Sequence, residues 1–214
     1  MYRMLGILLG LVLLGTAWAK CDNPFYPVRE GWVWTYKSSL DGKTHTNTLS
    51  NVSDSGFTNT IQFDKGSVES RWRCDSNGLS SLEYGATNFS GKHNQFNLKT
   101  VDSKGVMIPT NLSIGSTWTY SFTLEGDMST GKINSNVETS SKVVGEETVS
   151  VPAGTFKAFK VESTSVMKMS MNINGKTQDL PSNTIKSTSW YAPGVGLVKS
   201  LSNDITTELV SLKK

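Results

Sequence analysis

The chain has 214 residues and a formal net charge of +3, and 36% of its residues are hydrophobic. A charge so close to balance argues against nucleic acid or an anionic membrane surface as the partner. Ser, Thr, Asn and Gly dominate the polar positions, while helix formers such as Ala and Glu are sparse. This composition favours strands joined by turns, so we expect a mainly β protein.

Residues 1–19 have the layout of a secretory signal peptide. A charged start at Arg3 is followed by an apolar run over residues 5–14 and by the small-x-small sequence Ala17-Trp18-Ala19. The run is too short for a transmembrane helix, which needs about 20 apolar residues. We predict an exported, periplasmic or extracellular protein of residues 20–214, monomeric and not membrane-spanning after cleavage.

The two cysteines, Cys21 and Cys74, predict one disulfide, because an exported chain folds in an oxidising compartment. A bond between them would stabilise the fold by about 4 kcal/mol in the chain-entropy model. Two free thiols are the alternative. A lipid-anchored cysteine would follow the cleavage site directly, whereas Lys20 intervenes here. We therefore expect a soluble protein rather than a lipoprotein.

An internal repeat runs through the chain. Residues 31–36 (GWVWTY) recur as residues 115–120 (GSTWTY), and Asp41-Gly42 matches Glu125-Gly126 at the same offset. Each copy is predicted to be a strand that ends in an acidic-Gly hairpin turn. The sequence thus predicts one β-rich domain, residues 20–214, built from two related meanders (about 24–105 and 106–214).

The clearest strand covers residues 159–173, where odd positions are mostly apolar and even positions mostly polar. Asn174-Gly175 then supplies a hairpin turn. The candidate ligand-binding residues, Met167, Met169, Met171 and Ile173, lie on the odd face. Thioether side chains adapt to varied apolar ligands. The alternatives are a sheet's core face, or a copper site, which would need further Met, His or Cys nearby.

No pattern in the sequence points to catalysis. His45 and His93 lie in polar segments, are expected in exposed loops, and show no metal-ligand spacing with the cysteines. Glu146-Glu147 is expected to be solvated rather than a glycosidase pair. There is no Gly-x-Ser-x-Gly elbow, phosphate-binding loop or dinucleotide fingerprint. We therefore expect no enzymatic activity, metal or cofactor.

Residues 149–156 (VSVPAGTF) and 190–199 (WYAPGVGLVK) resemble motifs of a family of exported bacterial β-rich proteins of unknown function. Residues 27–36 and 109–120 match loosely the Pro-x3-Gly-x2-Trp-x-Tyr pattern of that family. The resemblance implies a curved antiparallel sheet, distantly similar to the half-barrels of lipoprotein carriers. It implies no established activity and offers no catalytic residues.

The expected fold is all-β, a curved antiparallel sheet or partly closed barrel. A curved sheet with one apolar face must cover that face or bind something with it. The first hypothesis is a carrier or sensor that binds an apolar, lipid-like ligand on a concave face containing the four Met and Ile side chains. The second is a non-enzymatic structural or interaction module of the cell envelope with a filled core.

Overall fold

The computed structural model describes residues 21–82, 97–128 and 131–214, which form strands and turns. The predicted signal peptide (residues 1–19) and His93 lie outside these ranges. The first strands are β1 (Asp22–Asn23), β2 (Tyr26–Pro27), β3 (Val33–Ser38), β4 (Thr44–Ser50), β5 (Gly56–Phe63), β6 (Gly66–Asp75), β7 (Gly78–Ser81), β8 (Asn97–Gly105) and β9 (Ile108–Pro109). The later strands are β10 (Thr117–Met128), β11 (Gly131–Val151), β12 (Gly154–Ile173), β13 (Lys176–Asp179), β14 (Asn183–Ala192), β15 (Gly196–Ser202) and β16 (Ile205–Lys213). In this part of the chain no helix is long and apolar enough to cross a membrane.

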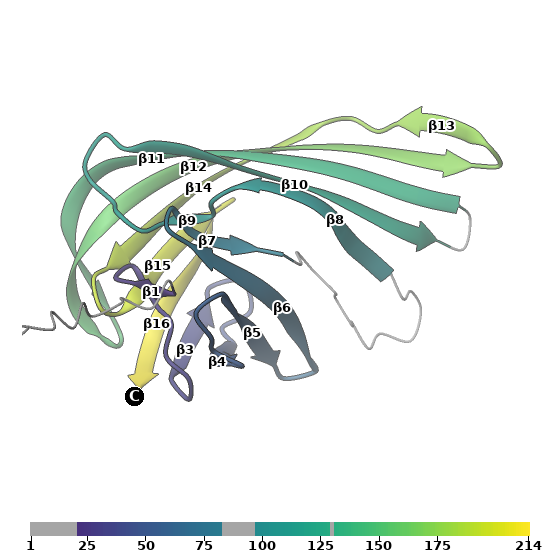
Figure 1. The fold of residues 1–214 in the computed structure, drawn as a ribbon. Helices are drawn as coiled ribbons and strands as arrows, with labels where there is room; N and C mark the ends of the chain where they lie inside the picture. Colours follow the sequence, from purple (N-terminus) through teal and green to yellow (C-terminus); the bar gives the residue numbers. More distant parts are fainter. Residues whose placement is uncertain (1–20, 83–96, 129–130) are drawn as a thin grey trace, which may run out of the picture.

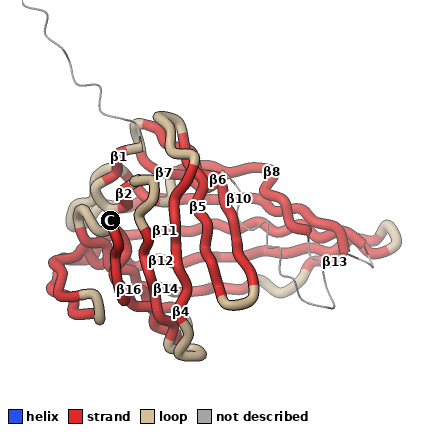
Figure 2. Tube along the Cα trace, turned by 90° about the horizontal axis from the view of Figure 1, so that it is seen from below, coloured by secondary structure: helices blue, strands red, loops and turns tan. Residues whose placement is uncertain are grey.

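Apart from a β1–β2 ribbon, the strands form one 14-stranded antiparallel sheet. Its order is β8-β10-β11-β12-β14-β15-β16-β3-β4-β5-β6-β7-β9, with β13 pairing to β12. The sheet curves so that the long strands β10, β11, β12 and β14 arch over β4, β5 and β6 (Figure 1). Figure 2 shows β4, β5 and β6 from below, paired side by side. The predicted curved antiparallel sheet is confirmed, and it stays open rather than closing into a barrel.

The turns follow the local sequence signals. At the β12–β13 hairpin, Asn174 and Gly175 have φ angles of 53° and 80°, the left-handed geometry that two-residue hairpins require. In the segment 190–199, Gly194 (φ 72°) turns the chain between β14 and β15. A Cβ on Gly196 would lie 3.5 Å from Pro27 Cδ and 3.8 Å from Trp34 Nε1. These are ordinary van der Waals separations, so the φ angle of 99° rather than a lack of space favours glycine at position 196.

One predicted turn is wrong. Gly42 does lie in a turn (φ 70°) between β3 and β4. Its counterpart, Glu125-Gly126, instead lies inside β10. There Glu125 pairs with Lys99 of β8 on one side and with Asn134 of β11 on the other. Backbone pairing on both sides outweighs the local preference of an acidic-Gly pair for a turn.

Side-chain hydrogen bonds connect the two ends of the sheet. The Tyr120 hydroxyl of β10 donates to the carbonyl of Ser81 in β7 at 2.7 Å. The hydroxyl of Ser80 donates to the carbonyl of Gly105, at the end of β8, at 2.9 Å. These contacts hold the sheet in its curved form although no continuous ladder closes it.

The main apolar core lies inside the curve, where Leu79, Val143, Val198 and Leu209 are fully buried. Trp34 of the first repeat copy is also buried, at 5% exposed. Its counterpart Trp118 is only partly buried, and its indole N–H donates to the Met107 carbonyl at 3.3 Å. The two tryptophans of the repeat therefore differ in burial.

Candidate functional site

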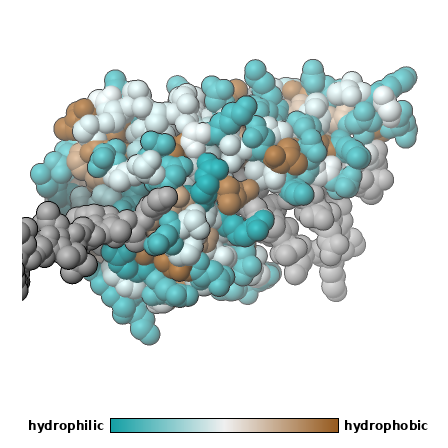
Figure 3. All heavy atoms as spheres, viewed as in Figure 1, coloured by the Kyte–Doolittle hydropathy of each residue, from teal (hydrophilic) through white to brown (hydrophobic). Residues whose placement is uncertain are grey.

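The face of the sheet that carries Tyr36, Val161 and Leu209 encloses the core and is called the inner face here. Cross-strand partners in a sheet point to the same side, and so do residues two apart along a strand. By this register the even positions of β10 and the odd positions of β11 (up to Val143), β12 and β14 all belong to the inner face. The visible surface in Figure 3 is largely hydrophilic, with scattered apolar side chains.

The N-terminal segment, residues 21–28, packs against one part of the inner face. The Tyr26 ring stacks on Phe57 and Trp72, with centroids 6.0 and 5.6 Å away. The Phe25 ring meets Phe159 of β12 edge-on at 5.4 Å. Burial raises the pKa of the Tyr26 hydroxyl far above its usual value, so this phenol stays protonated. The segment therefore fills the inner face near β3, β5 and β6 with neutral aromatic groups.

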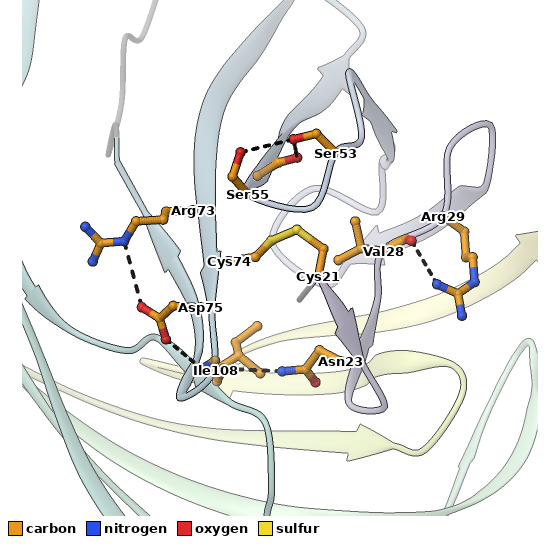
Figure 4. Close-up of a disulfide and its surroundings, with 12 residues drawn as sticks. Cys21, Asn23, Val28, Arg29, Ser53, Ser55, Arg73, Cys74, Asp75 and Ile108 are labelled. Atoms are coloured by element: carbon orange, nitrogen blue, oxygen red, sulfur yellow. Dashed lines mark hydrogen bonds and ion pairs between the residues drawn. A yellow bond between two sulfur atoms is a disulfide. The ribbon is translucent and has the colours of Figure 1, made fainter. Parts of the chain in front are cut away.

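A disulfide joins this segment to the sheet. Cys21 is bonded to Cys74 of β6, as predicted, and both residues are buried (Figure 4). Close by, the side-chain amide of Asn23 donates to the carbonyls of Ile108 and Pro109, at 3.4 and 3.1 Å. The disulfide and the amide of Asn23 therefore attach the N-terminal segment to β6 and β9.

The four predicted ligand-binding residues, named the Met stripe here, lie together on β12. Met167, Met169 and Met171 are half-buried, and Ile173 is 38% exposed. The stripe begins eight residues beyond Phe159, which is about 26 Å at the usual 3.3 Å per residue. It belongs to neither buried apolar cluster formed by the described residues. The structure thus brings the four side chains together outside the sealed core.

The cross-strand neighbours of the Met stripe extend this apolar surface. Val137, Ser135 and Ile133 of β11 lie opposite Met167, Met169 and Met171. On the next strand, Phe122 and Leu124 of β10 lie opposite Val137 and Ser135 and are buried. The apolar positions therefore continue across three strands, from the half-buried Met stripe to the buried Phe122 and Leu124, with one hydroxyl among them, that of the buried Ser135.

A band of hydroxyl side chains separates the Met stripe from the core end of the inner face. Ser141, Ser163, Ser187 and Ser202 are successive cross-strand partners from β11 to β15. The neighbouring rows add Thr139 opposite Ser165, and Ser189 opposite Ser200. Two pairs hydrogen-bond at 2.8 Å, Thr139 with Ser165 and Ser141 with Ser163. These eight residues are called the hydroxyl band: Thr139, Ser141, Ser163, Ser165, Ser187, Ser189, Ser200 and Ser202.

His45 is not in an exposed loop, as predicted, but in β4. Its ring is half-buried between Tyr36 and Phe63, with centroids 5.6 and 5.3 Å away. Burial lowers the pKa of the imidazole, and the nearby Asp41 only partly opposes this, so the ring is neutral at pH 7. The loop prediction was wrong because it relied on the polarity of the residues around His45. Thr44 and Thr46, which flank it, are polar but also favour strands.

A cavity of about 320 Å³ lies beside His45 and Phe63, between the β3–β4 and β5–β6 turns. Its rim carries an exposed ion pair between Lys43 and Asp64, 3.1 Å apart. Within the described ranges, no three His, Cys, Asp or Glu side chains lie together as metal ligands would. Glu147 accepts a hydrogen bond from the Trp190 indole N–H at 2.5 Å, and Glu146 pairs with Lys157. Each of the two carboxylates therefore has a neighbouring side chain as its partner.

These features define the class of protein as an open, strongly curved antiparallel sheet with an apolar core on its inner face. The chain belongs to the DUF3108-like family, whose model matches residues 67–214. This agrees with the resemblance to a β-rich family of unknown function, although it does not test the two sequence motifs. No curated protein matches the chain.

One solved structure shares the fold, and two others resemble the chain at lower TM-scores. A candidate lipoprotein from Parabacteroides distasonis is 17% identical with a TM-score of 0.53, covering 89% of this chain and 99% of that one. A candidate exported protein with a YmcC-like fold from Bacteroides fragilis is 18% identical, with a TM-score of 0.49 and coverages of 90% and 100%. The hypothetical lipoprotein YmcC from Escherichia coli is 11% identical, with a TM-score of 0.42 and coverages of 90% and 88%. At these identities the first likeness shows the fold alone, and the other two carry no argument.

Sequence reasoning missed the hydroxyl band and the packing of the N-terminal segment on the inner face. Ser163 and Ser165 were visible as interruptions of the apolar alternation in β12. Their partners Ser187 and Ser202 are 24 and 39 residues away from Ser163 in the chain. Only the register between strands reveals that these hydroxyls form a row.

Proposed function

We propose that the protein is a non-enzymatic carrier or sensor that binds an apolar, lipid-like ligand on the Met stripe. The observation that carries this proposal is a set of partly exposed apolar side chains on the inner face, outside both buried clusters. Contiguous apolar surface that the fold leaves uncovered is typical of a binding site. Flexible thioethers suit such a site because they adapt to ligands of varied shape.

The protein acts in the periplasm or outside the cell. The signal-peptide layout and the Cys21–Cys74 disulfide support this location, since disulfides persist in oxidising compartments. The similar Parabacteroides distasonis protein, described as a candidate lipoprotein, is in keeping with a location in the cell envelope. The Cys21–Cys74 disulfide supports a mature chain without a lipid on Cys21, because the bond occupies that sulfur.

A structural or interaction module of the cell envelope is the second candidate. The packing of Phe25 and Tyr26 favours it, because these side chains fill part of the inner face from within the chain itself. In that case the Met stripe would be the outer margin of a filled core and would bind no small molecule.

The substitution Met169→Asp separates the two functions. If the Met stripe lines an open groove, the new carboxylate stays hydrated, so the melting temperature hardly changes while binding of a neutral fluorescent apolar probe is lost. If the stripe is part of a sealed core, an unpaired buried charge will unfold the protein. The measurements are a thermal melt and probe fluorescence for both proteins.

The matched control is Ser140→Asp, which places the same carboxylate on the exposed outer face of β11. It should leave both the melt and probe binding unchanged. If the folded wild type binds no apolar probe, the carrier function is contradicted. The structural or interaction module then remains as the proposed function.

A further inference from the structure

The inner face carries no charge along the strands that surround the Met stripe. Among the described inner-facing positions of β10, β11 up to Val143, β12 from Val161, β14 and β15, there is no Asp, Glu, Lys or Arg. The charged residues of these strands are at the alternate, outer-facing positions, as Glu138, Lys142 and Lys168 illustrate. The first charged side chain on this face is Lys176, opposite Ile173 at the tip.

The facing strands β3 to β6 are equally free of charge on the inner face. Their described inner positions carry aromatic, aliphatic, Ser, Asn and His side chains. The titratable groups among them, Tyr36 and His45, are neutral at pH 7, because burial raises the pKa of the phenol and lowers that of the imidazole. A ligand with an ionised head group would find no opposite charge there, and desolvating it would be costly.

The same face carries hydrogen-bonding groups that find no partner among the described residues. Ser135, between Leu124 and Met169, is 3% exposed, and its hydroxyl has no partner among the described residues. Asn59, on the inner face of β5, is 5% exposed, and its amide oxygen is likewise without a partner in the described part of the chain. Buried polar atoms in folded proteins are nearly always hydrogen-bonded. Two such atoms on the inner face, neither with a partner among the described residues, support a hydrogen-bonding ligand.

The hydroxyl band adds further groups of this kind. Ser187, Ser189, Ser200 and Ser202 are half-buried, and within the described residues their hydroxyls make no side-chain hydrogen bond. The band lies beside the Met stripe on the same strand, since Ser165 is two residues from Met167. A neutral polar region therefore adjoins an apolar one along β12.

From this arrangement we propose that the ligand is a neutral amphiphile. Its hydroxyl-bearing head group hydrogen-bonds to the hydroxyl band, and its apolar chain lies along the Met stripe. This inference rests on the proposed carrier function and specifies the ligand class, an uncharged lipid with hydroxyl groups such as an acylglycerol or a neutral glycolipid. Fatty acids and cationic amphiphiles are disfavoured because none of the described residues places a charged side chain on the inner face beside the hydroxyl band, and Lys176 lies at the far end of the Met stripe.

The test is competition against a bound neutral probe, N-phenyl-1-naphthylamine, by three 12-carbon amphiphiles below their micelle concentrations. These are 1-monolauroylglycerol, laurate and dodecyltrimethylammonium. We expect the monoacylglycerol to displace the probe from the full-length mature protein at a concentration at least tenfold lower than either ion. Displacement by laurate or the ammonium compound at an equal or lower concentration would overturn the proposal.

A pair of double variants tests the place of the head group. Ser187→Ala with Ser189→Ala removes two unpartnered inner hydroxyls of β14, and Thr184→Ala with Thr188→Ala alters the outer face of the same strand. The inner variant should weaken competition by the monoacylglycerol at least tenfold while the probe itself still binds, and the outer variant should match wild type. Unchanged competition in a folded inner variant would overturn the assignment.

The outcomes distinguish this inference from the function on which it rests. If the folded wild type does not bind the probe, the carrier function fails and the ligand class fails with it. If the probe binds but the three amphiphiles compete equally, the carrier function stands and the neutral head group is wrong. If instead the monoacylglycerol competes best, comparing an acylglycerol with a neutral glycolipid of equal chain length identifies the source of the head group.

Discussion

At the scale of single residues, Ser135 has a buried hydroxyl with no hydrogen-bond partner among the described residues. An apolar side chain at this position would have no such unpaired group. Leaving a buried polar group unpaired costs about 1–3 kcal/mol. We therefore expect Ser135→Ala to increase the free energy of unfolding by about 1 kcal/mol, measured by urea denaturation. The control is Ser141→Ala, which breaks the 2.8 Å bond to Ser163 and should cost about 1 kcal/mol. A loss of stability in both variants would show that Ser135 has a structural partner.

His45 should make the stability of the fold depend on pH. Burial lowers its pKa in the folded protein below the unfolded value, so the unfolded state binds more protons. Its contribution is complete above the unfolded pKa of about 6.5 and is lost as the pH falls through the folded pKa. The variant His45→Phe keeps an aromatic ring between Tyr36 and Phe63 and has no such titration. Urea unfolding at pH 7.5 and pH 5.0 should show a smaller loss in the variant, and an equal loss would contradict the prediction.

At the scale of elements, the N-terminal segment has little secondary structure of its own and depends on its contacts. Its two short strands pair only with each other, and the disulfide crosses 53 residues to reach β6. Closing a loop of this length lowers the entropy of the unfolded chain. The segment is therefore held against the sheet by a covalent bond, ring packing and the hydrogen bonds of Asn23, and not by strand pairing with the sheet.

Removal of that bond should destabilise the protein substantially. The double variant Cys21→Ser with Cys74→Ser is expected to lose about 4 kcal/mol of unfolding free energy in urea. Reduced wild type should behave like the variant, and unreduced wild type should show no free thiol after denaturation. Free thiols in protein exported by its own host, or a stability unchanged by reduction, would contradict a structural role for the Cys21–Cys74 bond.

At the scale of the whole molecule, the inner face has two ends with different character. One end is filled by Phe25 and Tyr26, while the other carries the Met stripe beside uncharged hydroxyl groups. The long strands β11 and β12 have 21 and 20 residues, whereas β4 and β5 on the facing side have seven and eight. The long strands therefore extend past their counterparts (Figure 1), which leaves an inner surface that the sheet itself does not cover.

The strand character, several turns and the disulfide could be predicted from the sequence, because they depend on neighbouring residues or on the compartment. Alternation along residues 159–173 assigned the Met side chains to one face, and Asn174-Gly175 specified a left-handed hairpin turn. The pairing of Cys21 with Cys74 followed from there being only two cysteines. Each of these inferences needed no knowledge of contacts distant in the chain.

Which surfaces pack against each other could be seen only in the tertiary structure. Pairing with β8 and β11 keeps Gly126 in a strand, although its local sequence favours a turn. Inter-strand register brings Ser163, Ser187 and Ser202 into one row, and none of them is distinctive in the sequence alone. The position of Tyr26 on the inner face depends on rings from three other strands. The physical reason is that register and curvature arise from contacts summed over the whole sheet, which no local window contains.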